Sequence, residues 1–119
     1  MQQKSSGAFH QKLSENIDRF VYGVYEVTQA FPRDEVFGAT SQLRRSALSV
    51  ALNYTEGYAR HGKNELGHFL KISYASLKEA LYIVRFANKR KWLSDNDAKK
   101  LELLGDSIGK MLWPIFSRS

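Results

Sequence analysis

The fold is decided by residues 39–89, ATSQLRRSALSVALNYTEGYARHGKNELGHFLKISYASLKEALYIVRFANK, a stretch without proline. Apolar residues recur three or four positions apart on both sides of Gly62, which is typical of two amphipathic helices, at about 39–59 and 63–89. Gly62 supplies the stop signal between them. The apolar face of the first segment is Leu43, Ala47, Val50, Ala51 and Tyr54. That of the second is Leu66, Phe69, Leu70, Leu77, Leu81 and Val84.

Two more helical segments flank this pair. The first runs from about Phe9 to Ala30 and ends at Phe31-Pro32, because proline disfavours helix at the preceding residue. The other follows Ser94, a good N-cap, and Pro114 is expected to end its regular part a turn before the C-terminus. Short connections between long helices predict an all-α, antiparallel up-down-up-down four-helix bundle. We expect one domain over residues 1–119, with residues 1–8 as a flexible tail.

Composition and motifs argue against several classes of protein. The 119 residues include no cysteine, which excludes a disulfide scaffold and a cysteine nucleophile. No signal-peptide pattern and no stretch near a membrane span's length is present, so a cytoplasmic protein is expected. His61, Glu65 and His68 are spaced to share a helix face, but no second segment carries a matching ligand motif. No phosphate loop or nucleophile motif occurs, so the sequence predicts no enzyme, cofactor or metal site.

The positive charge is concentrated in one part of the chain. The net charge is +6, and residues 60–91 hold eight basic residues against two acidic ones. Within this part, basic residues and tyrosines alternate at spacings of three and four, which places them on one helix face. Lysines can neutralise phosphates and tyrosines can stack on bases. The candidate nucleic-acid-binding residues are Lys71, Tyr74, Lys78, Tyr82, Arg85 and Lys89, followed by Arg90 and Lys91. The alternatives are a solvated face or a subunit interface.

A polar stripe marks one face of the 39–59 helix. It consists of Gln42, Arg45, Ser49, Asn53, Glu56 and Arg60. Small residues on this helix, such as Ser46 and Ala47, let another helix approach closely. We interpret the stripe as a packed polar seam, within one subunit or between subunits, with a solvated outer face as the alternative.

The same region resembles a known family. The carrying residues are Phe31-Pro32, the block from Gly38 to Ala47 that contains Thr-Ser-Gln-Leu-Arg-Arg, Asn53 and Glu56-Gly57. The chain resembles the bacterial four-helix-bundle family encoded by intervening sequences of 23S ribosomal RNA genes. It is also similar to the accessory variability protein of diversity-generating retroelements. The resemblance implies a homopentamer without enzymatic activity, and a relative that works with reverse transcriptase and RNA.

Two functions follow from these observations. The first is a homo-oligomeric bundle, a pentamer by resemblance, that binds RNA or DNA through the basic face of the 63–89 helix. The second is an adaptor or scaffold with no role with nucleic acid, in which the polar stripe of the 39–59 helix builds the oligomer and the basic face binds an acidic protein partner. A reverse transcriptase is the protein partner that the resemblance implies. No membrane association is expected.

Overall fold

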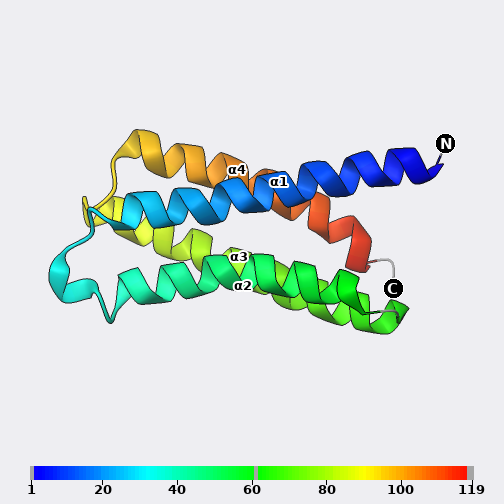
Figure 1. The fold of residues 1–119 in the computed structure, drawn as a ribbon. Coiled ribbons are helices and arrows are strands. Elements are labelled where there is room, and N and C mark those ends of the chain that lie inside the picture. Colours follow the sequence, from blue (N-terminus) through cyan, green and yellow to red (C-terminus); the bar gives the residue numbers. More distant parts are fainter. Residues whose placement is uncertain (1, 61, 118–119) are drawn as a thin grey trace.

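The computed structural model describes residues 2–60 and 62–117, with side chains from residue 7 onward. Four long helices carry the fold, and a short 3-10 helix lies in the first connection (Figure 1). The elements in chain order are α1 (Gln2–Thr28), η1 (Arg33–Glu35), α2 (Ala39–Ala59), α3 (Lys63–Lys89) and α4 (Asp95–Ser117). No strand occurs in the described ranges.

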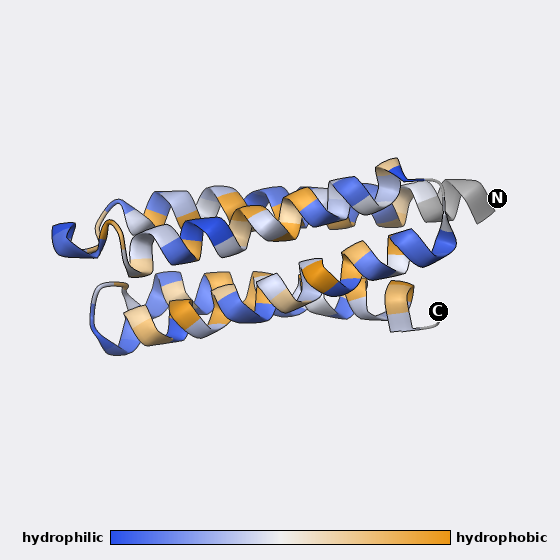
Figure 2. Ribbon diagram, turned by 90° about the horizontal axis from the view of Figure 1, so that it is seen from below, coloured by the Kyte–Doolittle hydropathy of each residue, from blue (hydrophilic) through white to orange (hydrophobic). Residues whose placement is uncertain are grey.

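The helices form an antiparallel up-down-up-down bundle, as the sequence predicts. Each helix packs on the next along the chain and α1 packs on α4, whereas the backbones of diagonal pairs do not approach closely in the described residues. The connections α1–α2 and α3–α4 therefore lie at one end and the α2–α3 turn at the other (Figure 1). Figure 2 shows apolar and polar residues alternating along every helix, as amphipathic helices require. The centre of the bundle is formed by Leu13, Ile17, Phe20, Val24, Leu43, Val50, Leu70, Leu77, Val84, Ile108 and Leu112.

The expected helix boundaries hold for α2 and α3, and differ at the two ends of the chain. Helix α1 begins at Gln2 rather than near Phe9, so residues 2–8 are helical where a tail was expected. The prediction relied on apolar periodicity, and none precedes Phe9. A helix can continue beyond its apolar face, because backbone hydrogen bonds hold each turn. Pro114 does not end α4, which continues to Ser117. Proline removes one backbone hydrogen bond, but Phe116 beyond it is only 7% exposed, and its burial favours the last turn.

Helices α2 and α3 form the most extensive helix pair, and serines line their contact. The Ser73 hydroxyl donates to the carbonyl of Val50 at 2.7 Å, and the hydroxyls of Ser49 and Ser76 lie 2.7 Å apart. Ser46 donates to a Glu79 carboxylate oxygen at 2.9 Å. Small side chains let the helices approach closely, and each hydroxyl recovers a hydrogen bond that burial would otherwise remove. No buried side-chain nitrogen or oxygen is left unpaired in the described residues.

Helix α4 approaches α3 at a glycine. A Cβ atom added to Gly105 would lie 2.6 Å from one Cδ atom of Leu81 and 3.0 Å from the other. Leu81 is itself 3% exposed and has little room to move. The glycine therefore lets Leu81 fill the interface, although glycine inside a helix costs roughly 1 kcal/mol relative to alanine.

We predict that Gly105→Ala lowers the free energy of unfolding by about 1–2 kcal/mol, because the overpacking outweighs the gain in helix propensity. Denaturant unfolding monitored by circular dichroism measures the difference. Gly7→Ala is the control, since a Cβ at Gly7 would meet nothing within 4 Å. If Gly105→Ala is as stable as Gly7→Ala, the close contact at Leu81 is not a constraint on the fold.

Candidate nucleic-acid interface

A row of basic side chains runs along the outer flank of α3, on the side next to α4. We use the name basic row for Lys71, Tyr74, Lys78, Tyr82, Arg85, Lys89, Arg90 and Lys91. All of these are exposed except Tyr74, which is partly buried. Because α3 is continuous from Lys63 to Lys89, the first six positions share one face of a single helix.

The cations of the basic row have no carboxylate partners in the described part of the chain. Both ion pairs found there belong to Arg60. The ammonium of Lys78 lies 5.2 Å from the centre of the Tyr74 ring, and the guanidinium of Arg90 lies 5.6 Å from the centre of the Trp92 ring. The row therefore carries positive charge that no ion pair neutralises, and such charge attracts polyanions through its summed potential.

The two tyrosines of the row differ in their surroundings. The Tyr82 side chain is 65% exposed and makes no ring contact or hydrogen bond with the described residues. The Tyr74 ring packs on α4, with its centroid 5.5 Å from that of Trp113 and 5.4 Å from that of Phe116. Tyr82 can therefore offer a free face to a ligand, whereas Tyr74 mainly joins α3 to α4.

Lys91 has an unusual backbone conformation for its residue type. Its φ is 65°, in the left-handed region that favours glycine, and it is the only non-glycine residue there among those described. The amide of Trp92 donates to the carbonyl of Ala87 at 2.9 Å, and that of Lys91 donates to Asn88 at 3.0 Å. This pair of bonds is the Schellman motif, which usually places glycine at the Lys91 position. Folding alone would favour glycine, so the lysine breaks a local rule at the end of the basic row.

The polar stripe of α2 divides into an inner and an outer part. Ser49 bonds to Ser76 of α3, and the Asn53 amide donates to the Ser49 carbonyl at 2.9 Å, so this part lies at the α2–α3 contact of one subunit. Gln42 and Arg45 are exposed and make no side-chain hydrogen bond with the described residues. The stripe from Gln42 to Glu56 lies on the continuous helix α2 and spans both the α2–α3 contact and the surface beside it, whereas Arg60 lies beyond the end of the helix in an extended conformation.

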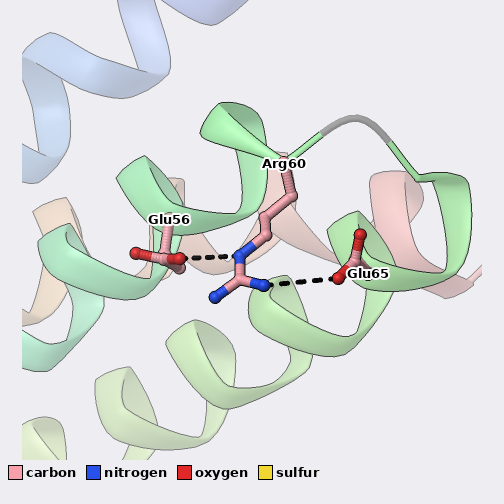
Figure 3. Close-up of polar contacts among 3 residues, drawn as sticks. All are labelled: Glu56, Arg60 and Glu65. Carbon is pink, nitrogen blue, oxygen red and sulfur yellow. Dashed lines mark hydrogen bonds and ion pairs between the residues drawn. The ribbon is translucent and has the colours of Figure 1, made fainter.

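Arg60 completes the stripe at the α2–α3 turn. Its Nε donates to Glu56 at 2.7 Å and one Nη donates to Glu65 of α3 at 3.4 Å (Figure 3). The hydrogen bond to Glu56, followed by the charge of that carboxylate, raises the pKa of Arg60 above its ordinary value. These exposed pairs join the end of α2 to the start of α3 within one subunit. Glu65, considered above as a metal ligand, is therefore engaged by Arg60.

The described residues contain no group of three histidine, cysteine or acidic side chains placed to hold a metal ion. His61, the first member of the set considered in the sequence, lies outside the described residues. His68 is exposed and its ring lies 5.3 Å from that of Phe69.

None of the described helices is both long and apolar enough to cross a membrane.

Sequence reasoning missed the residues of α4 that lie beside the basic row. Trp113 is 53% exposed, and it shares with Asp106 and Lys110 a groove that also contains Lys78. The sequence offered one indication of this site. Trp113 lies outside the apolar face of α4, and a large aromatic residue on a polar helix face is unusual.

Fold and surface together define a class: an antiparallel four-helix bundle whose most distinctive surface is a row of unpaired cations. The model of the 23S rRNA-intervening sequence protein family matches residues 11–113, and the chain belongs to this family. A solved structure of a protein of unknown function, from the S23 ribosomal protein family of Bacteroides thetaiotaomicron, superposes with a TM-score of 0.81. It is 15% identical and the match covers 87% of this chain and 97% of that chain. This likeness shows the shared fold. No curated protein shows significant similarity to the chain.

We predict that Lys91→Gly raises the free energy of unfolding by up to about 1 kcal/mol, because glycine adopts the left-handed conformation without strain. Denaturant unfolding measures the change. Lys89→Gly, two positions earlier and at the last residue of α3, is the matched control and should lower stability by roughly 0.5–1 kcal/mol. A destabilised Lys91→Gly protein would show instead that the lysine side chain supports the fold.

Proposed function

We propose that this protein is a non-enzymatic homo-oligomeric bundle, a cytoplasmic pentamer, that binds RNA through the basic row of α3. The observation that carries the proposal is the strip of exposed cations without carboxylate partners, from Lys71 to Lys91. Lys91 adds a second argument, since it occupies a position where glycine would favour folding. Residues that break a local folding rule concentrate at functional sites.

The chemistry of the row fits contact with a nucleic-acid backbone. Each lysine is a mobile point charge that neutralises one phosphate and releases its counterions. Such contacts position a protein on RNA but do not read its sequence, so we expect little sequence specificity. We name RNA rather than another polyanion because the family name refers to an intervening sequence of 23S rRNA.

We predict that Lys71→Glu with Lys78→Glu weakens binding to structured RNA by at least about tenfold and reduces the slope of log affinity against log salt by about 2, because two phosphate contacts are lost. Fluorescence anisotropy over a salt series measures both quantities. Lys12→Glu with Lys100→Glu makes the same charge change at exposed positions of α1 and α4, and is the matched control.

The two double variants decide whether the row or only the net charge matters. The proposal requires the α3 variant to lose much more affinity than the control. Equal losses would assign binding to net charge, and salt-insensitive or absent binding would contradict the proposal.

Exposed apolar side chains on α1 and α2 support the oligomeric part of the proposal. Tyr22 is 77% exposed and Leu52 is 63% exposed, and Leu48 lies with Tyr22 along a groove between the two helices. Apolar side chains gathered on one face are typical of surfaces that pack against another protein chain. The face lies away from the basic row, so assembly through it leaves the row open.

We predict that light scattering gives five times the mass of one chain, and that Leu52→Glu with Tyr22→Glu shifts the protein toward the monomer, because charges buried in an interface lack partners. Circular dichroism checks that the variant stays helical. Leu103→Glu, at a residue of α4 that is 59% exposed, is the control and should keep the assembly. A monomeric wild type would contradict this part of the proposal.

An adaptor that binds a protein partner is the second candidate. Phe37, in the connection between η1 and α2, is 95% exposed beside Val36, which is 50% exposed. Exposed aromatic side chains in a connection are suited to insertion into a partner's pocket. Recovery from the native host separates the candidates: partners retained after nuclease treatment favour the adaptor, and partners lost after it favour RNA binding.

A further inference from the structure

A groove between α3 and α4 runs beside the basic row and contains an aromatic ring that the fold does not bury. The groove encloses about 310 Å³ and is lined by Tyr74, Lys78, Asp106, Gly109, Lys110 and Trp113. Trp113 is 53% exposed, although tryptophan is one of the side chains that contribute most when buried. The sequence places it one turn after Gly109, on the flank of α4 that borders α3.

The Trp113 ring is held in place by other rings. Its centroid lies 5.5 Å from that of Tyr74, with the planes at 55°, and 5.3 Å from that of Phe116, with the planes at 72°. These two ring contacts restrain the indole, and Trp113 remains 53% exposed. A ring held in this way loses little conformational entropy when a ligand stacks on it.

Gly109 keeps the floor of this groove open. A Cβ atom added there would meet Tyr74 and Leu77 at 3.6 Å, which is ordinary van der Waals contact. Unlike Gly105, this glycine is therefore not required by a close approach of α3. Its effect is that no side chain covers the space between Lys78 and Trp113.

The charges of the groove are mixed and unpaired. No ion pair joins Lys78, Lys110 or Asp106 to any described residue. The ammonium groups of Lys78 and Lys110 attract phosphate oxygens, whereas the Asp106 carboxylate repels phosphate. The same carboxylate accepts hydrogen bonds from the amino groups of nucleobases. A groove that only held phosphate would not contain Asp106, but one that held a base and its phosphates could use all three groups.

We infer that the groove takes one base of a single-stranded RNA segment, stacked on Trp113 with its amino group toward Asp106 and its flanking phosphates on Lys78 and Lys110. The inference rests on the proposed function, because the basic row provides the path for the rest of the backbone. It adds that the strand is unpaired at this point, since the bases of a duplex are stacked inside the helix and are not available.

The test uses the fluorescence of Trp113. The chain has two tryptophans, and Trp92→Phe leaves Trp113 as the only one. In this background we expect single-stranded RNA of about 10 nucleotides to quench the fluorescence as it binds. Duplex RNA and inorganic polyphosphate, which offer phosphates but no free base, should bind the basic row without quenching.

Substitution of the ring gives the second readout. We expect Trp113→Leu to weaken binding of single-stranded RNA roughly 5- to 100-fold, the effect of losing one stacked base. Its affinity for polyphosphate and its salt dependence should not change. Trp113→Phe keeps an aromatic face and should retain most of the affinity. The quenching measurement leaves residue 113 unchanged, so it tests the inference even if a variant at this position folds poorly.

The outcomes separate this inference from the proposed function. Salt-dependent RNA binding without quenching, and with full affinity in Trp113→Leu, overturns the inference and leaves the proposed function intact. If neither RNA nor polyphosphate binds, both fail. Equal quenching by a polyglutamate peptide would show that the groove takes an acidic protein segment, and would also overturn the inference.

Discussion

The close contact between α2 and α3 is the constraint on which the rest of the structure depends. Serines bring the two helices together, and their hydroxyls bond to one another, to the Val50 carbonyl and to Glu79. Each bond compensates a polar group that the contact removes from water, so the pair gains packing without an unsatisfied donor. Arg60 adds an exposed link at the turn, where it contacts Glu56 and Glu65 (Figure 3).

This contact determines what the other flank of α3 can do. Because α3 meets α2 through serines and the carboxylate of Glu79, its lysines and arginines are not used in the seam and lie on the side toward α4. On that side the Lys78 ammonium lies near the Tyr74 ring, and no cation of the basic row forms an ion pair with a carboxylate in the described ranges. One helix therefore combines a packed polar flank with a charged free flank. The proposed RNA site and the groove at Trp113 are both consequences of that division.

The fold was predictable from the sequence to a greater extent than the site. Apolar periodicity and Gly62 predict helices at about 39–59 and 63–89, which are the ranges of α2 and α3. The Asp97 amide donates to the expected Ser94 cap at 3.1 Å. The start of α1 was not predictable, since no apolar residue marks it. Spacing placed the basic row on one face, but it could not show that Tyr74 packs on α4. Nor could it show that Trp113 joins the groove, because helical spacing does not identify the neighbour across an interface.

The central claim is that the protein meets RNA with the basic row, and lysine footprinting tests it most directly. Acetylation of the assembled wild-type protein, read by mass spectrometry with and without RNA, compares every lysine at once. We predict that RNA protects Lys71, Lys78, Lys89 and Lys91, while Lys12 and Lys100 stay reactive. Equal reactivity in both states, or protection confined to Lys12 and Lys100, would contradict the claim.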